Sequence, residues 1–278
     1  MTVTFNTVKG AWNLVVHDPE GFWQNAKRYF LKARSGTIKI NGINFRIDLQ
    51  IDPTMHRMYF KTYQRTITNV CKKFLKRGDV FIDVGANIGY ISAFALGLVG
   101  KEGSVHAFEP VPRYLDRLRQ VCVDNPGYDI HVNGVALGGK EGGGIIAVTK
   151  LNNIGWNTMV PDFMTPGTIE DHIKINVTTL SHYLFSKSIQ NVRLVKIDTE
   201  GYEFPVIKGF EAYLRKTRAL PIIIMEINPS AYPKLQASID EFDTLTKDLG
   251  YMSFNSDLKQ PIRVDTINEI TDVVFIPG

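Results

Sequence analysis

The sequence predicts an α/β fold, with one doubly wound, mostly parallel sheet of seven strands and an antiparallel C-terminal edge. Five short segments are almost entirely apolar, and helical patterns separate most of them. Strands of this kind are buried on both faces, as in a parallel sheet that is covered by helices. Two further apolar segments, 252–254 and 273–276, follow one another without a long helix, which predicts the antiparallel edge.

The composition is that of an ordinary globular protein, because 44% of the 278 residues are hydrophobic and 22% are charged. It excludes long disordered, collagen-like and coiled-coil chains. The 32 Lys and Arg residues against 28 Asp and Glu give a net charge of +4 without a long basic run, so no nucleic-acid partner is expected. The longest apolar run, residues 220–225, is far below the ~20 residues of a membrane span, and no signal-peptide core is found. No membrane partner is therefore expected. Because the chain has only two cysteines, we expect it to lie in a reducing compartment, the cytoplasm.

Two parts of the chain differ in their residue patterns. Residues 1–54 are interpreted as an N-terminal extension and residues 55–278 as the main domain. Mixed apolar, basic and aromatic residues predict a helix within 11–34. Period-two alternation on both sides of an Asn-Gly pair predicts a β-hairpin from residues 37–40 and 43–47. This extension could dock on its own domain, cover a cofactor or form a homodimer.

The main domain is expected to begin with a helix over residues 53–77, which Gly78 ends. Further helices are expected at 88–98 and 113–123. Residues 138–190 are rich in Gly, Asn and Thr, and we expect them to be irregular, with a lid or substrate loop. The five parallel strands are expected at 80–84, 104–108, 129–132, 192–197 and 220–227.

A glycine turn joins the first parallel strand to the next helix, in the run Asp83-Val84-Gly85-Ala86-Asn87-Ile88-Gly89. Glycine lets the backbone approach a ligand closely, and a helix N-terminus favours an anionic group. Glu109 ends the second strand, where an acid can accept hydrogen bonds from both hydroxyls of a ribose. This order predicts a nucleoside-cofactor site at the carboxyl edge of a Rossmann-like sheet.

The glycine turn also discriminates between cofactors. Asn87 stands where the dinucleotide fingerprint G-x-G-x-x-G has its middle glycine, and its side chain would crowd a pyrophosphate. The acid Asp83 suits a ligand with an amino or cationic group, so S-adenosylmethionine fits better than NAD. An NAD(P)-dependent oxidoreductase is the less favoured alternative, and a non-catalytic binding module is a third.

Three blocks of the sequence resemble the FkbM family of S-adenosylmethionine-dependent methyltransferases, within the class I superfamily. They are residues 79–89, residues 107–110 and the D-x-E-G-x-E block at 196–203, which is the most discriminating. The resemblance covers about residues 55–278. It implies O-methylation of a hydroxyl on a small-molecule acceptor, such as a sugar, a polyketide or another secondary metabolite. A carboxylate or amine acceptor, including a peptide terminus, is the alternative.

The resemblance also implies roles for single residues. Family members often carry Tyr-Glu where this chain has Tyr63-Gln64, which puts a role for this segment at the cofactor in doubt. Glu109 would hold the ribose of the cofactor. The methionine side of the cofactor would be bordered by Asp83, Gly85, Asn87 and Gly89. The adenine would be bordered by Val135 and Ala136.

Methylation of a hydroxyl requires a group that removes its proton. Asp198 and Glu200 stand two residues apart at the end of the fourth strand, and we expect one of them to act as base or to orient the acceptor. No metal is expected. The alternative is a magnesium ion held by Asp198 together with Glu226 or Asn228, since oxygen ligands suit this ion.

Other side chains are given secondary interpretations. Glu203 is expected to pair with Lys208 or to face water. His106 is expected to be packed in the core. An acceptor pocket could be shaped by Trp156 with Asn152, Asn153 and Asn157, whose aromatic and amide groups suit a carbohydrate.

Overall fold

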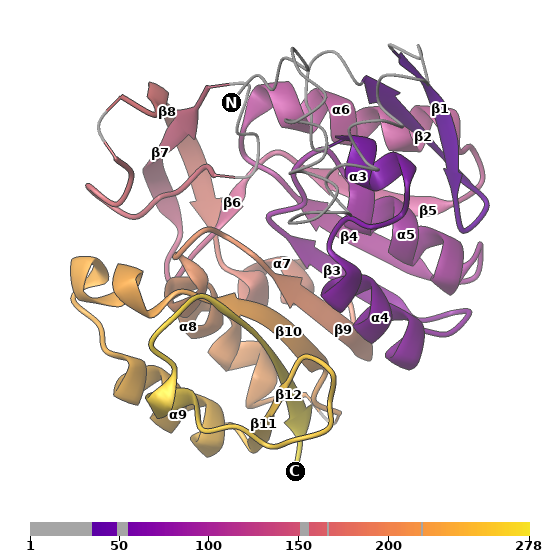
Figure 1. Ribbon diagram of the computed structural model, residues 1–278. Helices are drawn as coiled ribbons and strands as arrows, with labels where there is room; N and C mark the ends of the chain where they lie inside the picture. Colours follow the sequence, from indigo (N-terminus) through magenta and orange to yellow (C-terminus); the bar gives the residue numbers. More distant parts are fainter. Residues whose placement is uncertain (1–34, 49–54, 151–155, 166, 218) are drawn as a thin grey trace, which may run out of the picture.

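The computed structural model describes residues 35–48, 55–150, 156–165, 167–217 and 219–278. Its centre is a seven-stranded sheet (Figure 1) made of β3 (Val80–Val84), β4 (Ser104–Phe108), β5 (Asp129–Asn133), β9 (Val192–Ile197), β10 (Ile222–Ile227), β11 (Tyr251–Asn255) and β12 (Thr271–Pro277). The strand order is β11-β12-β10-β9-β3-β4-β5. The last five run parallel, whereas β12 is antiparallel to both of its neighbours. The predicted sheet and its antiparallel edge are confirmed.

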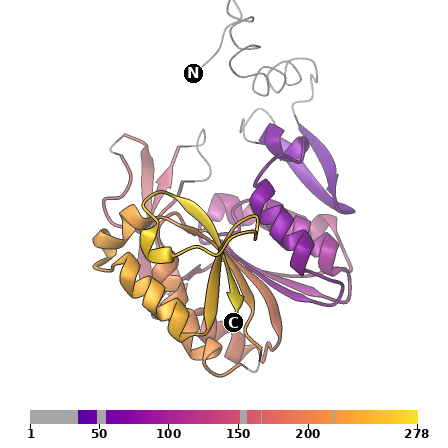
Figure 2. The same ribbon diagram turned by 60° about the horizontal axis from the view of Figure 1, so that its bottom comes forward.

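Helices cover both faces of this sheet (Figure 2). One face carries α4 (Arg65–Phe74), α5 (Tyr90–Val99) and α6 (Pro112–Asp124), and the other carries α7 (Leu180–Ser186), α8 (Glu203–Leu214) and α9 (Ile239–Asp248). Because side chains alternate along a strand, Phe81 joins the first core and Ile82 the second. Two short 3-10 helices, η2 (Pro229–Leu235) and η3 (Val264–Thr266), complete the C-terminal half. Nowhere in the described ranges is a helix both long and apolar enough to span a bilayer.

The predicted hairpin is confirmed as β1 (Ser35–Ile40) and β2 (Ile43–Asp48), with Ile40 paired to Ile43 across the turn. It packs against α5, where the side-chain amide of Asn41 donates to the carbonyl of Phe94 at 3.1 Å. Its buried side chains share one core with α4, α5 and the sheet. The helix expected within residues 11–34 lies outside the described residues.

The expectation of one continuous helix over residues 53–77 is wrong. The chain forms α3 (Met55–Tyr59) and α4, and the intervening segment contains two left-handed residues, Lys61 (φ 56°) and Gln64 (φ 43°). Helix α4 ends at Phe74, four residues before Gly78. The periodic apolar residues are present on both sides of the break, so periodicity alone could not locate it.

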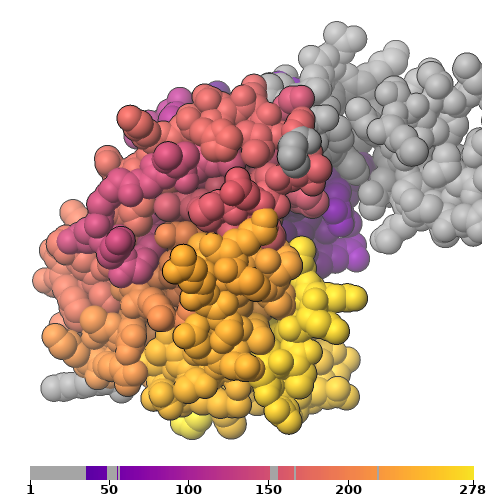
Figure 3. All heavy atoms as spheres, turned by 90° about the vertical axis from the view of Figure 1, so that its left-hand side faces the viewer, coloured from indigo at the N-terminus to yellow at the C-terminus, as the bar shows by residue number. Residues whose placement is uncertain are grey.

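The expectation of an irregular segment at 138–190 is also wrong. Besides α7, this region contains β7 (Gly142–Thr149) and β8 (Ile169–Thr178), which form a three-stranded sheet with β6 (Ala136–Leu137) in the order β6-β8-β7. Three consecutive glycines, 142–144, weaken the strand pattern in the sequence. Figure 3 shows this sheet, in magenta to pink, above the orange C-terminal half on one face of the molecule.

Candidate active site

The candidate site lies beside β3, at the carboxyl edge of the sheet, where the strand order reverses between β4 and β9. Ligands bind at such points because the loops that follow the two neighbouring strands diverge. Two small cavities open there, one of about 60 Å³ that is lined by Glu109 and one of about 50 Å³ that is lined by Lys196. We call them the Glu109 cavity and the Lys196 cavity. Their shared wall consists of Gly85, Asn87, Asp198 and Glu200.

The structure brings most of the sequence-predicted site residues together around these cavities. Leu137, Ile146 and Met159 add an apolar surface to the Glu109 cavity, and Gln64 and Lys196 line the other one. The predicted residues that line at least one cavity are Gly85, Asn87, Glu109, Val135, Ala136, Asp198 and Glu200. Asp83 and Gly89 line neither.

Close packing within the chain explains why positions 85 and 89 of the turn are glycines. A Cβ on Gly85 would lie 1.9 Å from the backbone oxygen of Asp198, and the φ of 72° also disfavours other residues. A Cβ on Gly89 would lie 2.6 Å from the side chain of Leu118 on α6. Gly85 therefore lets the ends of β3 and β9 meet, whereas Gly89 lets α6 pack against the start of α5.

Glu109 connects the glycine turn to the end of β4. Its Oε2 accepts a hydrogen bond from the backbone N–H of Asn87 and its Oε1 accepts one from Val111, both at 2.9 Å. Burial raises the pKa of Glu109 to about 7, although both hydrogen bonds act in the opposite direction. Each carboxylate oxygen has two lone pairs, so Glu109 keeps acceptor capacity for a ribose in the cavity.

Asp83 forms a buried ion pair beneath the turn. Its Oδ2 accepts from the hydroxyl of Ser92 at 2.6 Å, and its Oδ1 lies 3.2 Å from Nζ of Lys196. Asp83 is fully buried and lines neither cavity. It can therefore act on a bound cofactor only indirectly, through Lys196 and the glycine turn.

Lys196 is a site residue that the sequence interpretation missed. Its Nζ donates to the carbonyl of Gly85 at 2.8 Å and also lies 3.5 Å from Oδ2 of Asp198. Burial by itself lowers the pKa of Lys196, but the carboxylates of Asp83 and Asp198 outweigh it and raise the pKa above its ordinary value. The sequence signal was an acidic residue in one mostly apolar strand segment and a lysine in another, and the structure makes Asp83 and Lys196 register partners on adjacent strands.

Asp198 follows β9 directly and stands between the two cavities. Its Oδ2 accepts a hydrogen bond of 3.0 Å from the side-chain amide of Gln64. The Nζ of Lys196 approaches the same oxygen. Among the described residues, none donates a hydrogen bond to Oδ1 of Asp198.

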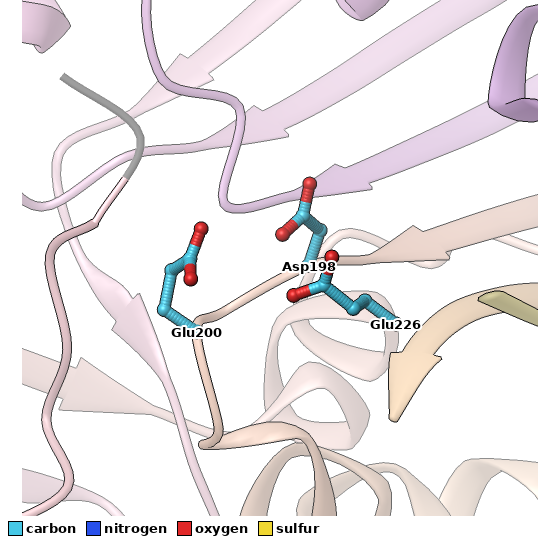
Figure 4. A group of neighbouring side chains, drawn as sticks. All are labelled: Asp198, Glu200 and Glu226. Atoms are coloured by element: carbon cyan, nitrogen blue, oxygen red, sulfur yellow. The ribbon is translucent and has the colours of Figure 1, made fainter. Parts of the chain in front are cut away.

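Two further carboxyl groups lie beside Asp198 (Figure 4). One oxygen each of Asp198, Glu200 and Glu226 lies within 4.8 Å of the other two. Burial, followed by the charge of Asp198, raises the pKa of Glu200 to about 9 and that of Glu226 to about 8. Asp272, the cross-strand partner of Glu226, has its pKa raised to about 6 for the same two reasons. Their surroundings therefore favour the protonated form of Glu200 and Glu226.

Glu203 organises the turn that carries Asp198 and Glu200. Its Oε1 accepts from the backbone N–H and the hydroxyl of Thr199, and from the backbone N–H of Gly201, at 2.9–3.0 Å. It is fully buried, and burial raises its pKa to about 7. The expectation that it pairs with Lys208 or faces water is wrong, because Glu203 is fully buried and its Oε1 accepts all three hydrogen bonds from this turn.

The three clustered carboxylates could hold a divalent cation, since magnesium and calcium take oxygen ligands. Asp198 and Glu226 do come together, as the metal alternative requires. The side-chain oxygen of Asn228 instead accepts from the hydroxyl of Ser230 at 2.7 Å. The expectation that the site uses no metal stays a prediction.

The secondary interpretations have mixed outcomes. Trp156 is 54% exposed and lines neither cavity, whereas Asn157 lines the Glu109 cavity. Asn152 and Asn153 lie outside the described residues. His106 is packed in the core as expected, with a ring nitrogen 2.9 Å from the hydroxyl of Tyr183, and burial lowers its pKa to about 4.

The chain is similar to one protein family and to several individual proteins. Residues 83–252 match the family described as Methyltransferase FkbM domain. The hexuronic acid methyltransferase AglP of Haloferax volcanii is 22% identical over 213 residues, which cover 74% of this chain and 82% of that protein. The solved structure of a SAM-dependent O-methyltransferase from Thermotoga maritima has a TM-score of 0.44 and 10% identity, covering 90% of this chain and 80% of that one. A TehB-like SAM-dependent methyltransferase from Corynebacterium glutamicum has a TM-score of 0.44 and 13% identity, covering 81% and 95%.

Proposed function

Because this chain belongs to the FkbM methyltransferase family and is an S-adenosylmethionine-dependent enzyme, we propose that it methylates a hydroxyl oxygen of a small molecule, and of a carbohydrate in particular. The observation that carries this proposal is the carboxylate of Asp198, which faces both cavities and has one oxygen without a donor among the described residues. A hydroxyl acceptor needs such a group, whereas a carboxylate acceptor does not.

The residues of the Glu109 cavity fit the cofactor. Glu109 has the remaining lone pairs to accept from ribose hydroxyls, and the apolar side chains near Val135 and Ala136 suit an adenine ring. When it is bound, S-adenosylmethionine supplies a methyl group that its sulfonium activates for displacement.

The chain contributes positioning and one proton transfer. We assign the base to Asp198, because Lys196 lies 3.5 Å from its Oδ2 and favours the ionised form, whereas burial raises the pKa of Glu200 and favours its protonated form. Protonated Glu200 can instead donate a hydrogen bond to an acceptor oxygen and orient it. Placing two reactants in line supplies most of the rate enhancement when the donor is already activated.

The charge of the site favours a hydroxyl over a carboxylate as the acceptor. An anionic acceptor atom would have to approach Asp198, and like charges repel strongly in a partly buried site. The relative AglP acts on a hexuronic acid, which carries both hydroxyl and carboxylate groups, so its name is compatible with either atom. An amine acceptor is the remaining alternative, and an NAD(P)-dependent oxidoreductase is disfavoured because Asn87 would crowd a pyrophosphate.

The proposal also covers the location of the protein and the bounds of its catalytic domain. We place the protein in the cytoplasm, with a small-molecule acceptor as its partner, in keeping with the two free cysteines. We also propose that the catalytic domain begins after residue 54, because no residue of the hairpin lines either cavity. The hairpin then stabilises the domain from outside the site.

The test is methyl transfer from a deuteriomethyl donor to neutral sugars, uronic acids and amines, followed by mass spectrometry. We expect the label on a hydroxyl, and we expect Asp198→Asn to lower turnover by ~100-fold or more. Binding of S-adenosylhomocysteine, measured by calorimetry, should persist in this variant. The matched control is Asp171→Asn, on the exposed part of β8.

Two results would overturn the assignment. Label on a carboxylate, or full turnover in Asp198→Asn, would exclude a hydroxyl acceptor activated by this residue. Binding of NADH in place of S-adenosylhomocysteine would exclude the methyl-transfer function altogether.

A parallel reaction with EDTA tests the prediction that no metal is used. Activity that disappears with EDTA and returns with magnesium would contradict this prediction.

A further inference from the structure

We propose that Gln64 is a positioning residue for Asp198: it holds one carboxylate oxygen so that the other is free to accept a proton from the acceptor. The proposal rests on the proposed function in giving Asp198 its role as base. The contact itself is independent of that role. It joins two residues that are 134 positions apart in the sequence.

The geometry of the contact is specific to one oxygen. The amide Nε2 of Gln64 donates to Oδ2 of Asp198 at 3.0 Å, and the ammonium of Lys196 lies 3.5 Å from the same Oδ2. Both donors therefore act on Oδ2. The other oxygen has no donor among the described residues, although Asp198 lines both cavities.

The local backbone places Gln64 at this point. Gln64 is the N-cap residue of α4, in a left-handed conformation with φ 43° and ψ 50°. Its carbonyl accepts the first bond of the helix, from the N–H of Thr68 at 3.0 Å. Its side chain makes no capping hydrogen bond and reaches Asp198 instead. The break between α3 and α4 thus places the side-chain amide of Gln64 at the carboxyl edge of the sheet.

The amide is the appropriate group because the surroundings of Asp198 are rich in ionisable side chains. A neutral donor stabilises the ionised carboxylate without adding charge. A glutamate at this position would set a second carboxylate at hydrogen-bond distance, and two such groups share a proton. The charged and titratable groups that face Asp198 are Lys196 with Asp83 and Tyr63 behind it, Glu200 and Glu203 on the turn, Glu226 on β10 and Asp272 on β12.

The experiment is a titration of the aspartate carboxyl carbons by 13C NMR in the unliganded protein, with the Asp198 signal identified by its loss in Asp198→Asn. We expect Gln64→Glu to move the midpoint of this signal upward by ~1 pH unit or more. Gln64→Leu should move it in the same direction by less, because it removes a donor without adding an acid. The acid limb of the kcat/KM profile for the best acceptor should shift in parallel.

The chain offers a matched control. Gln120 on α6 donates to Oδ1 of Asp124 at 3.0 Å, the same pairing far from the site, so Gln120→Glu should leave the Asp198 signal in place. An unchanged Asp198 midpoint in both Gln64 variants would overturn the proposal, and so would an equal shift in Gln120→Glu. If Gln64→Glu does not fold, Gln64→Leu decides. Failure of the proposed function would appear separately, as absent binding of S-adenosylhomocysteine in the wild-type protein.

Discussion

The acids of the turn after β9 stand within six positions of one another, yet they have different tasks. Asp198 faces the cavities and is paired with Gln64 and Lys196. Glu200 also faces the cavities, but burial beside Asp198 favours its protonated form. Glu203 points into the protein and accepts three hydrogen bonds. Spacing alone identifies these acids as a group, whereas their roles follow from where the turn directs each side chain.

Removal of the Glu203 carboxyl should therefore cost stability rather than chemistry. Glu203→Ala leaves three donors around Thr199 and Gly201 without their acceptor, so we expect the free energy of unfolding to fall by about 3 kcal/mol. Glu203→Gln retains an acceptor oxygen and should lose about 1 kcal/mol or less, with methyl transfer preserved. Urea denaturation at pH 7 measures both.

The control is Glu211→Ala, which removes a solvent-exposed ion pair with Arg215 on α8 and should cost about 0.5 kcal/mol at most. Glu203 would instead be a catalytic residue if Glu203→Gln were as stable as wild type but inactive while it still bound S-adenosylhomocysteine.

At the scale of the elements, the sequence predicted what depends on periodicity and turn chemistry. The apolar runs identified the seven strands, and the Asn-Gly pair identified the hairpin, because both signals are local. The break between α3 and α4 and the sheet of β6, β7 and β8 escaped prediction. At the first, Gln64 contacts Asp198 across the fold, and the second depends on pairing between β7 and β8, where three glycines weaken the strand pattern. Both are decided by contacts distant in sequence.

The docking of the hairpin on α5 can be tested at Gly97. A Cβ at this position would lie 2.5 Å from the backbone oxygen of Asn41 in the hairpin turn. Alanine stabilises an undocked helix by about 1 kcal/mol relative to glycine. Here the clash reverses the sign, and we expect Gly97→Ala to lower the free energy of unfolding by about 1–3 kcal/mol in urea denaturation.

The sign of this change decides the outcome. Gly36→Ala is the control, because a Cβ there would meet no atom within 4 Å. A stabilised Gly97→Ala variant would mean that the hairpin does not pack against α5. The proposal that residues before 55 support the domain from outside the site would then lose its basis.

Across the whole molecule, the site concentrates acids in a chain whose net charge is +4. Lys196 is the single buried cation in the part of the chain that the structure describes, and it stands between Asp83 and Asp198. Motifs predicted Gly85, Glu109 and Asp198 because each directly follows a recognisable strand, and parallel strands end at one edge. Such reasoning could not find Gln64, since only the folded chain brings its helix start to that edge.

This arrangement predicts that the protein becomes less stable as the pH rises. In the unfolded chain, glutamates ionise near pH 4.5, whereas the folded protein holds the pKa of Glu109 and Glu203 at about 7, of Glu226 at about 8 and of Glu200 at about 9. The native state therefore binds more protons over this interval, and its stability is lost as the pH rises through these values. His106, with its pKa lowered to about 4, acts in the opposite sense, but only below its ordinary value of 6.5.

Denaturation of the unliganded protein should show this loss directly. Between pH 6 and pH 9 we expect the free energy of unfolding to fall by more than ~2 kcal/mol, since one such carboxyl alone corresponds to about 1.4 kcal/mol for each pH unit of displacement. The double variant Glu200→Gln, Glu226→Gln should flatten the curve, because neither side chain can ionise, while Glu211→Gln should leave it unchanged. A free energy of unfolding that is constant or rises between pH 6 and pH 9 would contradict this prediction, because it would mean that these carboxyl groups ionise freely in the folded protein. The ionised acids at the sheet edge would then repel an anionic acceptor even more strongly.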